Sequence, residues 1–278
     1  MSSRASRLGL RMIALGYLAA LLVFPVGYVF YRAFEPGVGA FWDSITTPPA
    51  LHALWLTILI ALIVVPVNTV FGILCALVLV RQRFRGKVLL NALVDLPFAL
   101  SPVVIGLALI LVYGRTGWVG GWLTDQGFRV IFALPGMVLA TIFVSLPFVV
   151  REVMPVLREI GTEQEEAAAT LGASPVATFR RVTLPAIRWG VTYGIVLTTA
   201  RAIGEYGAVS VVSGKLVGRT ETMTLHVEES FQSFDLQAAY AASVVLACLA
   251  LLTLFAMNLF RKEIPDGDRR SAGDEALR

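Results

Sequence analysis

The chain has 278 residues, of which 57% are hydrophobic and only 15% are charged, and its formal net charge is +4 at pH 7. Soluble domains average roughly 45–50% apolar and about 25% charged residues, so this composition excludes an ordinary soluble domain. It indicates a protein that crosses a membrane several times. Cys75 and Cys248 both lie in apolar runs and the two histidines are isolated. We therefore predict no disulfide, no metal site and no catalytic group.

Six apolar segments are long enough to cross a bilayer, which requires about 20 residues of helix. We predict an all-α, polytopic membrane protein with six transmembrane helices, at about 12–31, 53–80, 92–113, 131–150, 189–212 and 238–260. The first segment follows a basic stretch, but it is longer than the apolar region of a signal peptide and should be retained. Residues 1–262 form one transmembrane domain in this interpretation, and the polar tail 263–278 is expected to be disordered.

The distribution of Lys and Arg predicts the orientation of the chain. These residues are concentrated in the N-terminus, in the connections 81–90 and 151–188, and in the C-terminal tail. Both termini and the connection 151–188 are therefore expected in the cytoplasm. The positive net charge follows from this asymmetry, so nucleic-acid binding is not expected.

The third and fifth segments contain features suited to a transport pathway. Ser101 and Pro102 interrupt the third segment, and such breaks are tolerated where a water-filled cavity satisfies the freed backbone groups. Arg201 is expected about 18 Å into the fifth segment, at 1.5 Å per residue, with Glu205 one turn further on. Charges at that depth are costly, so they line a pathway, contact another helix or pair with each other for structural reasons. Gly190 and Gly194 predict close helix packing.

A polar segment, 162–186, interrupts the apolar runs on the predicted cytoplasmic side. Thr162 and Glu165 have the spacing of a capping box, in which Thr162 caps a backbone N–H and Glu165 reaches back. The alanines at 167–169 favour a helix with little bulk on its surface. A first short helix is therefore expected here.

The second half of this segment predicts a turn and another helix. Gly172 can adopt the left-handed conformation that ends a helix, and Ser174 can cap the next one with Pro175 at its first position. Pro185 is expected to stop or kink the chain before the fifth apolar segment. The result is an elbow of two short helices with a small-residue face, on which another protein can dock and to which Glu166 can bond.

No P-loop is found, because the glycines near Lys215 have the wrong spacing and Leu216 replaces the Ser or Thr that binds magnesium. The chain is therefore not expected to hydrolyse ATP.

The elbow resembles the EAA loop of ABC importer permeases. The positions that match are Glu166, Ala167, Ala168, Gly172, Leu184 and Pro185. One position departs from the family pattern, since Val182 replaces the usual Ile. The resemblance implies that the elbow fits a groove on a cytoplasmic ATPase, and that the six matching residues couple the two proteins.

Residues from about 10 to 260 resemble the sulfate/thiosulfate permeases of the CysW type, most closely at 96–106, 181–190 and 201–214. The resemblance implies an ABC ATPase homodimer, an extracytoplasmic sulfate-binding protein and a sister permease; a heterodimer is implied, and a homodimer stays open. It also implies a non-catalytic subunit without a cofactor of its own, ATP and Mg²⁺ being bound by the ATPase. The predicted translocation pathway contains Ser101, Pro102, Arg201 and Glu205.

Several alternatives stay open at this point. Molybdate/tungstate permeases share the EAA loop and a related architecture, so the transported oxyanion is not fixed. An ion-coupled secondary transporter would leave the elbow unexplained, an intramembrane enzyme lacks a catalytic set, and a receptor would need a folded soluble domain. The external loop 213–237 either docks a binding protein or lies at the lipid boundary with Phe231 and Phe234.

Overall fold

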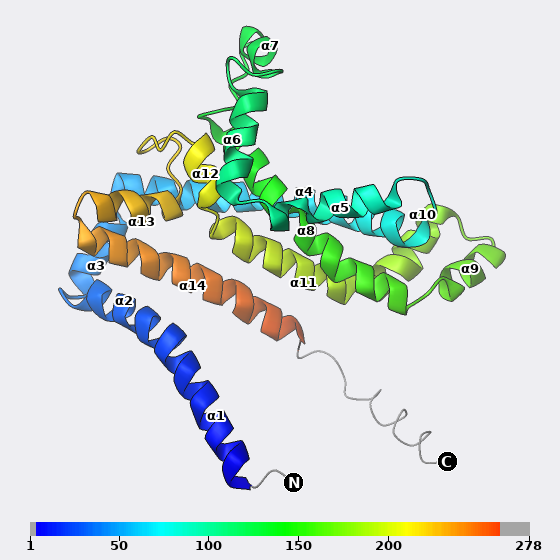
Figure 1. Cartoon of the computed structure of the whole chain (residues 1–278), viewed down its shortest axis with the longest axis horizontal. Coiled ribbons are helices and arrows are strands. Elements are labelled where there is room, and N and C mark those ends of the chain that lie inside the picture. The colour runs from blue at the N-terminus through cyan, green and yellow to red at the C-terminus, as the bar shows by residue number, and fades with distance from the viewer. Residues whose placement is uncertain (1–3, 262–278) are drawn as a thin grey trace. The chain divides into compact units, whose positions relative to one another are not determined.

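The computed structural model describes residues 4–261, and over this range every regular element is a helix, as the sequence predicts (Figure 1). The predicted disordered tail, 263–278, lies outside the described residues. The elements are α1 (Arg4–Leu18), η1 (Ala19–Val23), α2 (Phe24–Phe34), α3 (Val38–Ile45), α4 (Pro48–Arg81), α5 (Lys87–Ala99), α6 (Pro102–Tyr113), α7 (Gly120–Asp125), α8 (Leu134–Glu159), α9 (Glu163–Thr170), α10 (Pro175–Thr178), η2 (Phe179–Thr183), α11 (Leu184–Ile203), α12 (Gly207–Val212), α13 (Met223–Gln232) and α14 (Leu236–Arg261). The two η elements are π-helical turns.

Four helical stretches in the described range are long and apolar enough to cross a membrane: Gly9–Phe34, Pro48–Arg81, Leu134–Glu159 and Leu236–Phe255. They correspond to four of the predicted segments. The bent pair α5–α6 adds a fifth crossing if it counts as one span. The remaining predicted segment, 189–212, consists of α11 and α12 with a break between them. The count of six therefore fits these helices but stays a prediction.

The third predicted segment, 92–113, is not one helix: it is interrupted at Ser101 and Pro102, as the sequence predicts. The helices α5 and α6 meet at 113°. Leu100 and Ser101, which join them, are both extended, with ψ of 141° and 135°. Part of the cause is local: Pro102 follows Ser101, and the ring of a proline disfavours helical conformation at the preceding residue.

The chain divides into two compact units, of which the first contains the described residues up to Leu56 together with Lys215–Cys248. Its interior includes Ala53 of α4, Met223 of α13 and Ala242 of α14. Gln237 Nε2 donates a hydrogen bond of 2.9 Å to the carbonyl oxygen of Ala33, so the start of α14 is fixed to the end of α2.

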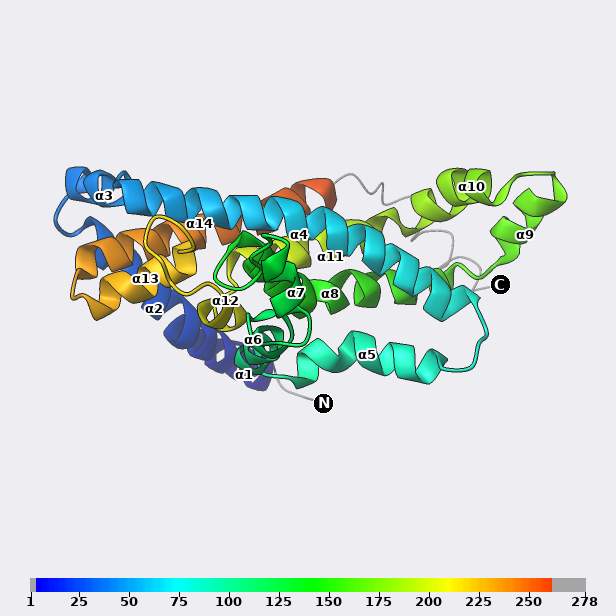
Figure 2. The same cartoon turned by 90° about the horizontal axis from the view of Figure 1, so that it is seen from above.

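The second unit contains Thr57–Gly214 and the described residues from Leu249 onward. The helix α8 lies at its centre and packs against α5, α6, α11 and α12, and Figures 1 and 2 show α8 and α11 side by side. Val149, Val153 and Leu157 of α8 are fully buried against side chains of α4 and α11. This apolar core fixes the long helices that carry the candidate sites.

Glycines allow the close approach of α4 and α11 to α8. A Cβ added to Gly72 or Gly194 would lie 2.7 or 2.8 Å from an atom of Val149. A Cβ added to Gly190 would lie 2.7 Å from the carbonyl oxygen of Glu152. The close packing that the sequence predicts from Gly190 and Gly194 is therefore confirmed.

Candidate functional site

The predicted elbow consists of α9 and α10 joined by a glycine turn. Gly172 has a φ of +84°, the left-handed conformation expected of it. The N–H of Gly172 donates to the carbonyl of Ala169, and that of Ala173 donates to the carbonyl of Ala168. This pair of bonds is a Schellman motif, which satisfies carbonyls left free at the end of a helix. The predicted glycine stop is confirmed.

The second helix of the elbow also begins as predicted. The hydroxyl of Ser174 accepts a hydrogen bond of 3.3 Å from the N–H of Ala177, and Pro175 occupies the first position of α10. Of the two outcomes predicted at Pro185, a stop or a kink, the stop is wrong, because helical conformation continues from α10 through η2 into α11. The wider π-helical turn at Phe179–Thr183 explains why: it gives room for the proline ring, which would otherwise clash with the carbonyl four residues earlier.

The predicted capping box at the start of α9 does not form. Thr162 is the N-cap, but its hydroxyl donates to Glu166 Oε1 at 2.7 Å instead of accepting from the backbone. Glu165 does not reach back either, because its carboxylate is engaged elsewhere. It accepts from the hydroxyl of Thr183 at 2.8 Å and pairs with Arg81, with 3.0 Å between Arg81 Nε and Glu165 Oε2.

Arg81 is the residue that sequence reasoning missed. It ends α4, and its Nη1 and Nη2 donate to the carbonyls of Leu157 and Gly161 at 2.9 and 2.6 Å. With Glu165, these contacts join the ends of α4 and α8 to the start of α9. The side chains of Arg81 and Glu165 are only 16% and 22% exposed. The sequence contained one signal, a basic residue at the end of an apolar run on the same predicted side as the acidic elbow.

The face of the elbow opposite Glu165 is open. Glu166, Ala167 and Gly172 are exposed, and Ala168 is half-buried. Two apolar side chains beside them are also exposed, Leu171 by 88% and Val176 by 68%. Of the other two predicted coupling residues, Leu184 is half-buried and Pro185 is exposed at the start of α11. The six predicted residues therefore lie along the elbow and its continuation, and their role in coupling stays a prediction.

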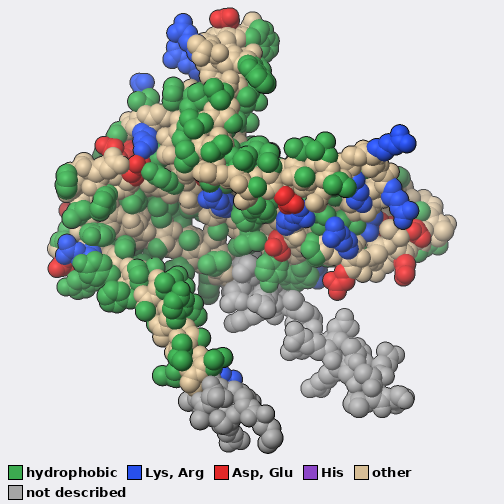
Figure 3. Space-filling model, in the orientation of Figure 1, with side chains coloured by type: hydrophobic (Ala, Val, Ile, Leu, Met, Phe, Trp, Pro, Cys, Tyr) green, Lys and Arg blue, Asp and Glu red, His purple; other side chains and the backbone are tan. Residues whose placement is uncertain are grey.

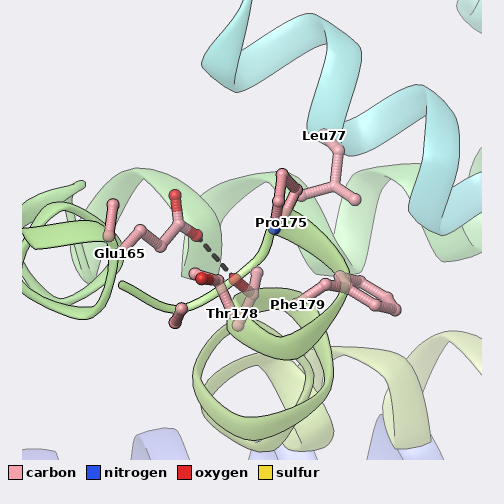
Figure 4. A pocket seen from close by; sticks show the side chains of 8 residues that line it. Leu77, Glu165, Pro175, Thr178 and Phe179 are labelled. Atoms are coloured by element: carbon pink, nitrogen blue, oxygen red, sulfur yellow. Dashed lines mark hydrogen bonds between the residues drawn. The ribbon is translucent and has the colours of Figure 1, made fainter. Parts of the chain in front are cut away.

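A cavity of about 320 Å³ lies between the elbow and α4. Its lining includes Leu77, Pro175 and Phe179, with Glu165 at one side; the hydrogen bond drawn in Figure 4 is the one from Thr183 to Glu165. Glu165 bonds to Arg81 of α4 and to Thr183, and Phe179 packs against the apolar core of the unit. The cavity shows that the elbow is not tightly packed on α4.

The predicted pathway residues lie at two helix breaks that meet. A Cβ added to Gly207, at the start of α12, would lie 2.8 Å from Cβ of Pro102, at the start of α6. One turn further on, a Cβ added to Gly106 would lie 2.8 Å from Cβ of Val211. The structure thus brings the Ser101–Pro102 break against the break that contains Glu205.

Along the chain, Arg201 precedes the end of α11 and Glu205 follows it. Arg201 is in the last turn of α11, where a positive charge suits the helix dipole. Glu205 follows the helix end, and its Oε1 accepts from the N–H of Ala208 at 2.8 Å, so it caps α12. Arg201 Nη2 is 2.7 Å from Glu205 Oε2. The pairing of the two residues, one of the predicted possibilities, therefore occurs, whereas the continuous helix predicted through them is wrong because α11 ends at Ile203.

A second cavity, of about 660 Å³, belongs to the first unit. Four of its lining residues are acidic, Asp43, Glu221, Glu229 and Asp235, and Glu221 Oε1 is 3.0 Å from Nδ1 of His226. Like charges repel, so this cavity is unfavourable for a dianion. In the external loop, Phe231 and Phe234 are 61% and 87% exposed, a finding compatible with both interpretations of that loop.

The apolar helices, the helix breaks and the elbow together define a multi-pass membrane protein with an exposed elbow of two short helices. The sequence model of the family described as binding-protein-dependent transport system inner membrane component matches residues 68–264. The chain belongs to this family, and it is a permease component of a binding-protein-dependent transport system.

Named relatives share most of the chain. It is 52% identical over 242 residues to the sulfate transport system permease protein CysW of Synechocystis sp., covering 87% of this chain and 88% of that protein. It is 47% identical to CysW of Escherichia coli, covering 95% and 91%. The sulfate transport system permease protein CysT of Salmonella typhimurium is 38% identical over 87% of both chains.

Solved structures show the same fold at low identity. A chain of a bacterial ABC transporter involved in the import of the acidic polysaccharide alginate superposes with a TM-score of 0.77 at 18% identity, covering 92% of this chain and 95% of that one. The alginate transporter in complex with a pentasaccharide-bound periplasmic protein gives 0.74 at 19% identity, covering 90% and 91%. The fold is that of ABC importer permeases, as the EAA resemblance implies.

Proposed function

We propose that this chain is a transmembrane permease subunit of an ATP-driven importer of sulfate or thiosulfate. The observation that supports sulfate or thiosulfate as the substrate is the similarity to CysW permeases, which covers most of both chains. The molybdate alternative has no such support. Because a permease of this kind is not an enzyme, ATP hydrolysis falls to a separate ATPase subunit.

The proposed assembly has four kinds of component. A sister permease of the CysT type completes the transmembrane part, since relatives of both types resemble this chain. An extracytoplasmic sulfate-binding protein delivers the anion, and two ATPase copies drive the cycle. We place both termini and the elbow in the cytoplasm, on the distribution of Lys and Arg.

In this proposal the exposed face of the elbow docks on the ATPase. Leu171 and Val176 supply apolar contact area, the small side chains of Ala167 and Gly172 allow close approach, and Glu166 accepts a hydrogen bond or ion pair. When ATP closes the ATPase pair, the elbow moves and the helices attached to it change arrangement.

The anion passes, in this proposal, beside the meeting point of the two breaks. Ser101 is exposed and is the N-cap of α6, yet its hydroxyl makes no capping bond. At that helix start the N–H groups of Val103 and Val104 precede the first helical hydrogen bond, which Ile105 makes to Ser101. The hydroxyl and these N–H groups can contact a passing dianion. Arg201 is compensated by Glu205, so the passage should bind the anion weakly.

The test is uptake by the complete complex in proteoliposomes that contain ATP. We expect uptake of labelled sulfate that requires the binding protein and is displaced by thiosulfate more effectively than by molybdate. Preferential uptake of molybdate would refute sulfate or thiosulfate as the substrate, and uptake without an ATPase would refute the ATP-driven mechanism. Ser101→Ala tests the passage separately, because it should change the sulfate dependence of uptake; an unchanged dependence would exclude the hydroxyl.

A further inference from the structure

A basic cavity of about 300 Å³ lies in the second unit between α4, α5 and α8, and its lining residues differ from those of the two candidate sites. It is formed by the last turn of α4, the first turns of α5 and the second half of α8. Its lining residues are Leu79, Lys87, Val88, Asn91, Arg151, Met154 and Arg158. Among these described residues there are three cations and no carboxylate.

The three cations are not equivalent. The charge of Arg151 is neutralised by Asp95: its Nε donates to Asp95 Oδ1 at 2.7 Å, and its Nη2 contacts Asp95 Oδ2 and Asn91 Oδ1. Lys87 Nζ donates only to a carbonyl, that of Gln82, at 3.2 Å. Within the described chain, neither Lys87 nor Arg158 has an ion-pair partner. The cavity therefore carries two uncompensated positive charges, beside a third cation that Asp95 holds in place.

This donor set suits a phosphate-class oxyanion. A guanidinium presents a planar fork of N–H groups and an ammonium a compact charge, and both bind the oxygens of phosphate. The amide of Asn91 keeps its N–H₂ donors, since its oxygen accepts from Arg151. An apolar or cationic ligand would gain nothing from these groups.

The surroundings of the cavity indicate where such a phosphate comes from. Val88 lines the cavity and is 84% exposed, and Leu89 and Leu93 follow on α5 with 65% and 51% exposure. Figure 3 shows hydrophobic side chains over α5 and Lys and Arg side chains close to its start. A charged group at the cavity and apolar chains along α5 match the two parts of a phospholipid, and basic pockets between transmembrane helices bind anionic headgroups.

We propose that this cavity binds a phosphate-class oxyanion, presented by an anionic phospholipid whose acyl chains lie along α5. Lys87 and Arg158 hold the headgroup phosphate, and Arg151 is positioned beside them by Asp95. The site shares no lining residue with the elbow or the meeting helix breaks, although Leu79 and Arg158 are close in sequence to Arg81 and Leu157, and it does not depend on which anion is transported.

The experiment uses the complete transporter complex in nanodiscs of phosphatidylcholine with and without phosphatidylglycerol. The amount of phosphatidylglycerol retained through purification is measured by lipid mass spectrometry. Each cation near the headgroup contributes about 1 kcal/mol, so the double variant Lys87→Gln, Arg158→Gln should bind phosphatidylglycerol about 30-fold more weakly. The matched control is Arg83→Gln, Arg85→Gln, which removes the same charge from exposed positions nearby.

A second arm separates a lipid from a free anion: inorganic phosphate is titrated into complexes in phosphatidylcholine alone. One outcome would support an oxyanion site but refute the phospholipid as its ligand. In that outcome the unmodified complex binds phosphate and retains no phosphatidylglycerol, and the double variant loses the phosphate binding. Equal retention of phosphatidylglycerol by the double variant and the control would refute the site. Should the double variant fail to fold, Val88→Asp at an exposed position places a repelling carboxylate at the cavity and should lower retention similarly.

Discussion

Replacing Gly172 by valine should uncouple ATP hydrolysis from transport. Gly172 has a φ of +84°, and a non-glycine residue in the left-handed region costs about 1–2 kcal/mol. An added Cβ meets nothing within 4 Å, so the backbone conformation accounts for the whole cost. A cost of this size shifts the balance between the intact and the opened turn by roughly 5–30-fold. The long helices do not depend on this turn, so membrane insertion should be unchanged.

The assay compares sulfate uptake with ATP hydrolysis by the reconstituted complex. We expect uptake to fall while hydrolysis continues, which lowers the number of anions moved per ATP.

The chain offers a matched control at Gly127. It has a φ of +83° and likewise nothing within 4 Å of an added Cβ, but it lies after α7, outside the elbow. Gly127→Val therefore carries the same backbone cost at a position without a predicted role in coupling. Normal coupling in Gly172→Val, or an equal loss of coupling in Gly127→Val, would contradict the elbow mechanism.

Two further variants test the attachment of the elbow and the meeting of the helix breaks. Arg81→Gln removes charged hydrogen bonds to α8 and α9, each worth about 1.5–3 kcal/mol before discounting for partial exposure, so it should lower both the melting temperature and the coupling ratio. Arg83→Gln, at an exposed position, should change neither, and an identical profile for the two variants would refute the attachment. Gly207→Ala places a Cβ 2.8 Å from Pro102 and should cost about 1–3 kcal/mol, whereas the nearest atom to a Cβ at Gly204 is 3.4 Å away. Equal melting temperatures and uptake for Gly207→Ala and Gly204→Ala would show that α6 and α12 do not need this close contact.

The elbow could be predicted from sequence because local rules determine it. The left-handed Gly172, the Ser174 cap and Pro175 at the first helical position each depend on residues within a few positions. The capping box failed for the opposite reason. Glu165 has a stronger partner in Arg81, which is 84 residues away in sequence, and a charged pair outcompetes the local bond. No local pattern contains that information.

The breaks in the third and fifth segments were only partly predictable. Pro102 marks the position of the first break, but periodicity does not give the 113° between α5 and α6, which depends on how α6 packs on α12. The Arg201–Glu205 pair forms, but their spacing of four wrongly favoured a helix that continues through both residues. Glu205 instead caps α12, a role that follows from the break at Gly204 and not from the spacing.

One helix connects the two candidate sites. The helix α11 begins where the elbow ends and stops at the Arg201–Glu205 break, a length of about 30 Å at 1.5 Å per residue. Gly190 and Gly194 pack it directly on α8, and Arg81 fastens the end of α8 to the start of α9. We therefore expect α8 and α11 to move together with the elbow. Because such a packed pair bends little, a displacement at α9 should reach the break beside Pro102 as a shift of α12 against α6.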